Sequence, residues 1–203
     1  MAGLKMIDGD EVINICPNNS DGPIIEIESL KIQLPEQTNV LFKSLPIVNQ
    51  KWQRIELPRE LEQIKSMDDW YESPREFQQR WSPYIDEEFR RRREGVWFMN
   101  NGVETYITGH HYMFLQWSKI DIGYPGYLDF QRKLFTHFAA CEADPRCMGQ
   151  IYTKCRRSGY TNMSAATLVD EGTQVKEKLL GIMSKTGTDA QEAVFGSKIV
   201  PIY

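Results

Sequence analysis

The chain has 203 residues and a formal net charge of −4, with 24 Lys and Arg residues against 28 Asp and Glu residues. Its content of 41% hydrophobic and 26% charged residues is that of an ordinary globular protein, and its length allows one large domain or one domain with an appendage. The mildly acidic balance excludes a nucleic-acid-binding surface that covers the whole protein, so any contact with DNA must be local.

Residues 1–57 are predicted to be an irregular, β-leaning segment. The stretch from Pro17 to Pro23 has the composition of a loop, and residues 24–28 alternate partly, as an exposed strand would. The segment contains no motif that we can assign to chemistry. It also lacks a basic region followed by an apolar run, and no run in the chain is long enough to span a membrane. We therefore expect a soluble, intracellular protein.

Residues 58–125 form a second segment, which favours helices. Three helices, each with a proline near its first residue, are predicted at residues 58–64, 73–81 and 82–93. The last one ends in Arg90–Arg93, four consecutive arginines that would suit contacts with a DNA backbone. Because acidic residues flank this run on both sides, we favour a solvated helix end whose cations face the negative pole of the helix.

A β-hairpin is predicted at residues 96–107, because Asn101 and Gly102 tolerate the positive φ angles of a tight primed turn. An aromatic-rich helix should follow at residues 109–119. It contains His110 and His111, but adjacent positions on a helix diverge by about 100° and do not readily share one metal ion. We therefore interpret these histidines as a packed, hydrogen-bonded pair.

Residues 126–203 form the third segment, with alternating helices and strands. An amphipathic helix is predicted at residues 129–143 and is broken by Asp144 and Pro145. A buried strand should begin at Met148 and lead through a basic loop into a helix that is capped by Thr161 or Asn162. A second strand is predicted at residues 179–184, and a further helix from residue 189.

The four cysteines are expected to be free thiols. They lie at Cys16, Cys141, Cys147 and Cys155, without C-x-x-C spacing and without a histidine pair nearby. A zinc site is therefore not expected, and reduced cysteines in a reducing compartment are the simpler interpretation. His137 has no visible partner in the sequence and is interpreted as a packing residue.

Residues 149–162 carry the strongest functional signal. A strand that leads through a tight loop into a helix presents the free N–H groups and positive dipole end of the first helical turn to an anion. The usual sequence of such a phosphate-binding loop is G-x-x-x-x-G-K-[ST]. Here Gly159 and Thr161 match the second glycine and the hydroxyl that binds Mg²⁺. Tyr160 occupies the lysine position, and Lys154 occupies the position of the first glycine.

A lysine at the head of such a loop can still reach the β- and γ-phosphates, because the loop curls around them. Lys154, Arg156 and Arg157 bring three cations to this short stretch. Arginine has a fork of donors that suits the charge developing on a transferring phosphoryl group. The competing interpretation is an ordinary basic surface turn between a strand and a helix.

The pattern K-x-x-R-x-G-Y-[ST] at residues 154–161 resembles the variant Walker A loop of the large terminase subunits of tailed bacteriophages, the ATPases that pump DNA into proheads. Residues 181–186 and 189–195 are similar to the strand and the helix that follow the loop helix in that family. The resemblance covers about the last third of the chain well. It is looser over residues 106–134, and the first part shows none.

The resemblance implies an α/β fold, namely an incomplete P-loop NTPase core of the ASCE type with a parallel sheet, preceded by a helical and β-hairpin appendage. It implies ATP and Mg²⁺ as cofactors, with Lys154 on the β- and γ-phosphates and Thr161 on Mg²⁺. The phosphates would be cradled by the backbone of the residues that open the helix: Ser158, Gly159, Tyr160, Thr161 and Asn162. Arg156, or else Arg157, would stabilise the developing charge. Gln131 is the candidate for the adenine contact, by position alone.

The resemblance further implies double-stranded DNA, the portal protein and the small terminase subunit as partners, with a homo-oligomeric ring in the cytoplasm of the infected bacterial host. Such a motor also needs a downstream acidic pair and a nuclease part with clustered carboxylates. The stretch from Leu168 to Glu171 mimics that pair, but it follows the loop too closely for a parallel crossover. We therefore expect a fragment that binds nucleotide weakly and hydrolyses it poorly by itself.

Two other classes of protein stay open. One is a helicase-like P-loop translocase, in which the same loop would serve a different motor. The other is a non-catalytic assembly module whose basic loop binds a phosphate group or a DNA backbone, with salt-sensitive DNA binding and no saturable binding of nucleotide.

Overall fold

A computed structural model of the chain describes residues 52–100, 102–121, 123–154, 156, 158–200 and 202, together with the backbone of five strands before residue 42. Four of these strands form an antiparallel sheet in which each pairs with the next: β1 (Leu4–Asp8), β2 (Glu11–Cys16), β3 (Ile24–Ile27) and β4 (Leu30–Gln33). The strand predicted at residues 24–28 is β3. The loop predicted between Pro17 and Pro23 lies outside the described residues.

The helical arm that follows differs from the three predicted helices. A short 3₁₀ turn, η1 (Leu61–Gln63), precedes α1 (Met67–Glu72), a helix that was not predicted although Ser66 and Asp69 form a capping box at its start. The next helix, α2 (Arg75–Glu94), runs unbroken through Pro83, so the prediction of a new helix start there is wrong. Pro83 is exposed, and on the water-facing side solvent can satisfy the carbonyl group that its missing N–H leaves free.

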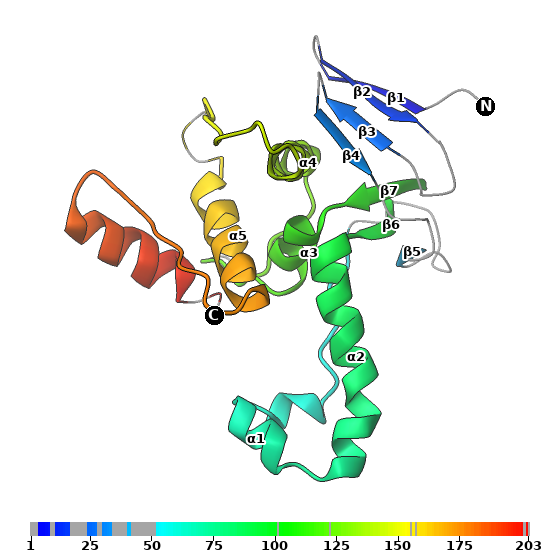
Figure 1. Cartoon of the computed structure of the whole chain (residues 1–203), viewed down its shortest axis with the longest axis vertical. Coiled ribbons are helices and arrows are strands. Elements are labelled where there is room, and N and C mark those ends of the chain that lie inside the picture. Colours follow the sequence, from blue (N-terminus) through cyan, green and yellow to red (C-terminus); the bar gives the residue numbers. More distant parts are fainter. Residues whose placement is uncertain are drawn as a thin grey trace.

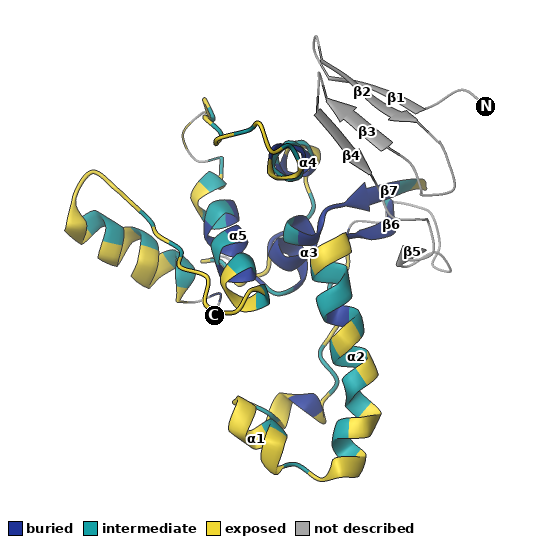
Figure 2. Ribbon diagram, viewed as in Figure 1, coloured by how far each residue is buried: buried dark blue, intermediate teal, exposed yellow. Residues whose placement is uncertain are grey.

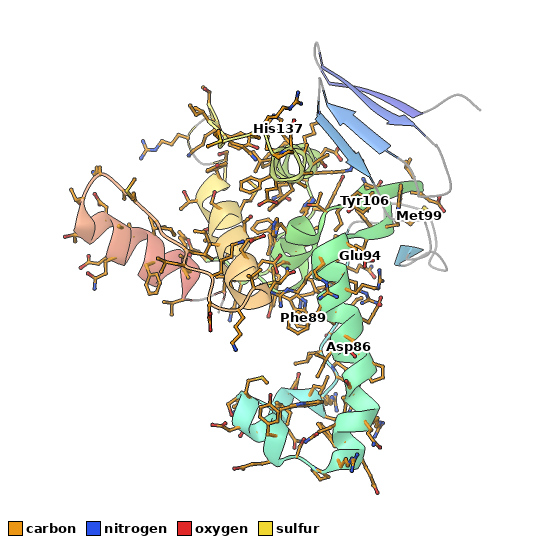
Figure 3. The ribbon with its side chains drawn as sticks, in the orientation of Figure 1. Asp86, Phe89, Glu94, Met99, Tyr106 and His137 are labelled. Carbon is orange, nitrogen blue, oxygen red and sulfur yellow. The ribbon has the colours of Figure 1, made fainter. Side chains whose placement is uncertain are left out.

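The β-hairpin is confirmed. Strand β6 (Val96–Asn100) pairs antiparallel with β7 (Val103–Ile107), and Gly102 in the turn has a φ of +84°. Strand β5 (Val40–Leu41) adds to the outer edge of β6 in parallel, which completes a three-stranded sheet. The hairpin is anchored to the end of α2, because the Tyr106 hydroxyl donates to the carbonyl oxygen of Glu94 at 2.5 Å (Figure 3).

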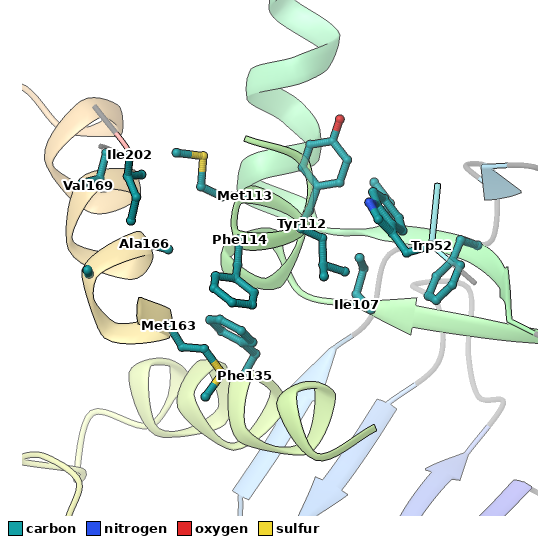
Figure 4. Packing of buried hydrophobic residues seen from close by; sticks show 14 residues of the cluster. Trp52, Ile107, Tyr112, Met113, Phe114, Phe135, Met163, Ala166, Val169 and Ile202 are labelled. Atoms are coloured by element: carbon teal, nitrogen blue, oxygen red, sulfur yellow. The ribbon is translucent and has the colours of Figure 1, made fainter. Parts of the chain in front are cut away.

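Three helices pack around the main hydrophobic core: α3 (Gly109–Gln116), α4 (Asp129–Ala143) and α5 (Tyr160–Gln174). Figure 1 shows α3 in the centre, between α4, α5 and the upper end of α2. Nearly every residue of α3 is buried (Figure 2). Figure 4 shows Phe114 of α3 between Phe135 of α4 and the α5 side chains, with Tyr112 turned toward Trp52 and the hairpin. The helix predicted at residues 129–143 is confirmed, and the one predicted at residues 109–119 is present but ends at Gln116.

The two strands predicted around the basic loop are not found. Among the described residues, neither 148–152 nor 179–184 forms a strand. Ile151, predicted to be buried, is 100% exposed, and Met183 is 97% exposed. A strand is stable only beside a neighbour that takes its N–H and C=O groups, and no described strand lies beside either segment. The helix predicted from residue 189 is present as η2 (Asp189–Ile199), which has π-helical hydrogen bonding.

The parallel P-loop sheet is thus not among the strands that the structure describes, and the P-loop α/β fold stays a prediction. The stretch from Leu168 to Glu171 lies within α5, which confirms that it is not the strand of a Walker B motif. Within the described ranges, no helix combines the length and the apolarity needed to cross a bilayer.

Gly109, the first residue of α3, allows a close approach to the end of α2. A Cβ atom placed there would lie 1.9 Å from the carbonyl oxygen of Arg92. We expect Gly109→Ala to lower the free energy of unfolding by about 1–3 kcal/mol, because two backbone segments would have to separate. Urea unfolding measures this loss. Gly126→Ala is the matched control, since no atom lies within 4 Å of its added Cβ, and an equal loss in both variants would contradict the steric explanation.

Candidate functional site

The basic loop leads directly into α5, as predicted, although the helix is capped differently. Gly159 is the N-cap residue and has a left-handed φ of +76°, so the prediction that Thr161 or Asn162 caps the helix is wrong. No side chain in the described part of the chain caps this end. The N–H groups of Asn162 and Met163 bond to the carbonyl oxygen of Gly159, at 3.0 and 3.2 Å. Those of Tyr160 and Thr161 belong to the free first turn, which favours an anion.

Side chains of the segment before the loop hold it against α4. The Gln150 amide donates to the carbonyl oxygen of Phe138 at 3.2 Å, and the Tyr152 hydroxyl contacts both Gln150 and Nδ1 of His137. Figure 3 labels His137 on α4. The ring of Tyr152 also packs on Tyr160 with 5.4 Å between centroids, which links the two ends of the loop. His137 therefore has polar partners, which the sequence analysis did not foresee.

The predicted cations of the loop stand at the surface. Lys154 and Arg156 are exposed, whereas Arg157 lies outside the described residues. Ser158 is half-buried, and its hydroxyl oxygen is fully covered without a hydrogen-bond partner among the described residues. Gly159 is exposed, and a Cβ atom built on it would meet no atom within 4 Å. There is consequently open space beside the loop at the end where the helix begins.

The remaining predicted ligands are divided between the loop and α4. Thr161 is exposed and Asn162 half-buried in the first turn of α5, so both adjoin the free N–H groups. Gln131 is buried near the start of α4, where its side-chain oxygen accepts a hydrogen bond from the Leu128 N–H at 3.1 Å. This amide oxygen caps its own helix, so an adenine contact would require the side chain to leave that bond.

A cavity of about 580 Å³ lies next to the loop, between the end of α4 and α5. Its wall contains the carboxylates of Glu142 and Asp144. Hydrogen bonds from Arg146 lower the pKa of Asp144 to about 2, so this carboxylate is ionised. The lining does not include Lys154, Arg156 or Thr161. Because like charges repel, this cavity is unsuitable for a triphosphate.

A cluster of charged residues between α2, α3 and α5 was missed by the sequence analysis. The Asp170 carboxylate, which is fully buried, accepts from Nε of Arg92 and from Nδ1 of His110, each at 2.7 Å. Nε2 of His110 faces Glu171 at 3.1 Å and Glu142 at 3.5 Å. Burial disfavours the charge on His110, but the hydrogen bonds to Asp170 and Glu142 outweigh burial and raise its pKa to about 9. The protonated imidazole and Arg92 therefore offset two of the three negative charges from within the fold.

The arginine run lies at the end of α2, as predicted, but most of its side chains are paired rather than solvated. Arg90 pairs with Glu87 and Glu94, and Arg91 pairs with Glu87 and Glu88, at distances of 2.6 to 2.9 Å. Arg92 turns inward to Asp170, and Arg93 is exposed. Three of the four guanidinium groups are thus occupied by carboxylates, which leaves little charge for a DNA backbone.

Comparisons with protein-family models, with curated proteins and with solved structures found no match to this chain. The resemblance to terminase large subunits therefore stays a hypothesis that rests on the sequence pattern at residues 154–161 alone.

Proposed function

We propose that the chain is a nucleotide-binding part of a terminase-like DNA-packaging ATPase, and that residues 154–161 bind the phosphates of Mg²⁺–ATP. The observation that carries this proposal is the free amino end of α5, which no described side chain caps. This end of the helix lies beside open space at Gly159 and comes directly after the exposed cations Lys154 and Arg156. Free N–H groups, a helix dipole and cations in one place favour a phosphate group.

The hydroxyls at this end suit a metal-bound phosphate. Thr161 is exposed in the first turn, where a hydroxyl can ligate Mg²⁺. The Ser158 hydroxyl has no described partner but is covered, so the loop would have to shift before this hydroxyl could donate to a phosphate oxygen. In the proposed arrangement Lys154 neutralises the β- and γ-phosphates, and Arg156 stabilises the charge that develops during transfer.

The exposed apolar side chains on both sides of α5 support the α/β part of the proposal. Met148 and Ile151 precede the helix and Leu179 and Met183 follow it, and each is at least 96% exposed. Apolar surface of this extent in the two segments that flank α5 marks contact regions. The two segments do not form strands in this structure. The proposal requires them to pair as parallel strands in the assembled motor, where these side chains would be buried.

Titration of the chain with Mg²⁺ and a non-hydrolysable ATP analogue tests the proposal. We expect saturable binding that Lys154→Ala weakens at least tenfold, because a lost charge-assisted contact with phosphate is worth about 1.4 kcal/mol or more. Thr161→Ala should weaken binding only when Mg²⁺ is present. Lys176→Ala is the matched control, since it removes an exposed lysine beyond the other end of α5.

Two results would argue against the proposal. If Lys154→Ala and Lys176→Ala bind the analogue equally well, the displaced lysine has no role. If the chain binds no nucleotide but binds double-stranded DNA with steep salt dependence, the loop belongs to a phosphate-binding assembly module instead.

A further inference from the structure

One imidazole nitrogen and two carboxylate oxygens come together from three different helices. They belong to His110 of α3, Glu142 of α4 and Glu171 of α5. Nε2 of His110 lies 3.1 Å from Oε1 of Glu171 and 3.5 Å from Oε2 of Glu142, and the three atoms lie within 4.8 Å of one another. Within the described part of the chain, no other set of three histidine, cysteine or acidic side chains gathers its ligand atoms so closely.

The separations match those of ligands on one ion. Zinc binds imidazole nitrogen and carboxylate oxygen at about 2.0–2.2 Å, so two such ligands in neighbouring positions are roughly 3–3.5 Å apart. The imidazole of His110 already has this separation from both carboxylates. The Glu142 side chain is 43% exposed, so it can rotate to bring its oxygen closer to that of Glu171.

A buried carboxylate outside this set fixes the direction of the imidazole. Nδ1 of His110 lies 2.7 Å from the fully buried Asp170, and Arg92 and Gln174 hold that carboxylate in place. Nε2 is therefore the nitrogen that faces the two glutamates. Histidines that bind a metal ion almost always donate their other ring N–H to a carboxylate or a carbonyl group, which fixes the tautomer and makes the free nitrogen a stronger ligand.

The two carboxylate oxygens that face His110 are accessible to an ion. Lys178 pairs with Oε2 of Glu171, so Oε1 keeps its place beside the imidazole. Glu142 also lines the cavity between the end of α4 and α5, which gives an ion a path from solvent and leaves room for water as a further ligand. When the imidazole is neutral, the three carboxylates of this cluster are paired with only two cationic side chains, Arg92 and Lys178. The excess negative charge favours a divalent cation.

We propose that His110, Glu142 and Glu171 form a binding site for a divalent transition-metal ion such as Zn²⁺. The ion takes the place of the proton on Nε2 of His110. That proton is released to solvent, Nε2 and one oxygen of each glutamate coordinate the ion, and no group is oxidised. An imidazole ligand suits zinc and related ions, whereas Mg²⁺ prefers oxygen ligands alone. The site is independent of the proposed nucleotide site, and the sequence analysis missed it because the three ligands come from separate helices.

Co²⁺ is the probe of choice, because its absorption spectrum reports the ligands. We expect the reduced, metal-free full chain, without nucleotide, to bind one Co²⁺ with visible bands and without a sulfur-to-cobalt charge-transfer band. Zn²⁺ should displace the cobalt, and an excess of Mg²⁺ should not. Glu142→Gln keeps the size of the side chain but removes a charged ligand, so it should weaken Co²⁺ binding at least about tenfold. Glu76→Gln, which makes the same change at an exposed position in the first turn of α2, is the matched control and should bind as the unmodified chain does.

Thermal unfolding gives a second readout. Co²⁺ should raise the Tm of the unmodified chain and of Glu76→Gln and leave that of Glu142→Gln unchanged, because a ligand that binds only the folded state stabilises it. Both glutamates are exposed, so neither replacement disturbs the core. Equal affinity for Co²⁺ in Glu142→Gln and the unmodified chain would overturn the proposal, as would a chain that binds no Co²⁺. A strong sulfur-to-cobalt band would assign the ion to the cysteines and overturn it as well.

Discussion

Replacing Asp170 by alanine is expected to lower the free energy of unfolding by about 3–5 kcal/mol, the usual loss when one member of a buried ion pair is removed. The carboxylate accepts three hydrogen bonds, from Arg92 and His110 at 2.7 Å each and from the Gln174 amide at 2.8 Å. Without it, the guanidinium of Arg92, whose side chain is 12% exposed, keeps its desolvation penalty and loses its counter-charge. Urea unfolding at neutral pH measures the loss.

Asp121→Ala is the matched control for this prediction. Asp121 also pairs with a cation, Lys198, at 2.5 Å, but its side chain is 68% exposed. Exposed ion pairs contribute little to stability because water and salt screen them. Similar losses in the two variants would show that burial does not determine how much the Asp170 ion pairs contribute to the free energy of unfolding.

The contribution of His110 in this cluster to the free energy of unfolding should change with pH in a known direction. The pKa of His110 is raised to about 9 in the fold, above the value of about 6.5 expected for an unfolded chain. The stabilisation that comes from the protonated imidazole is therefore complete below pH 6.5 and is lost as the pH rises through 9. In Asp170→Ala this alkaline loss should shrink, because the main partner of the proton is gone.

The elements that the sequence predicted well are those determined by neighbouring residues. The hairpin follows from the Asn101-Gly102 turn, and α4 follows from its apolar periodicity and the break at Asp144 and Pro145. Helix α1 was missed although its capping box, Ser66 with Asp69, is a local signal that could have revealed it. Pro83 was misread because a helix start and an exposed proline inside a helix have similar sequences.

The strands and the polar clusters depend on residues distant in the chain. Residues 148–152 can form a strand only if a second strand lies beside them, and their own sequence does not specify that partner. Likewise, Arg92 and Asp170 are 78 positions apart, and only the packing of α2 on α5 brings them together. For the candidate site, the sequence predicted a loop that opens a helix, and α5 confirms that much. The capping role of Gln131 was not foreseen, because it depends on the conformation of one side chain.

His111, the residue after His110, should make the free energy of unfolding fall in acid. Its ring is fully buried, stacked on Phe135 with 4.8 Å between centroids and on Tyr127 with 5.6 Å. Burial is the main reason that its pKa falls to about 3, with a further contribution from the charge of Arg132. The unfolded chain takes up this proton near pH 6.5, whereas the fold resists it until about pH 3. The contribution of the neutral ring to stability is thus complete above pH 6.5 and is lost as the pH falls.

Each pH unit in this window corresponds to about 1.4 kcal/mol, so we expect a loss of about 2 kcal/mol at pH 5 and roughly 5 kcal/mol near pH 3. Urea unfolding between pH 7.5 and pH 4 measures the slope. His111→Phe keeps an aromatic ring in the stack but cannot take up a proton, so its stability should fall less steeply over this range than that of the unmodified chain. Because carboxylates contribute equally to the acid response of both proteins, the difference between the two slopes isolates His111. Parallel slopes would mean that the buried ring is protonated as readily in the fold as in the unfolded chain, which is incompatible with its position between Tyr127 and Phe135.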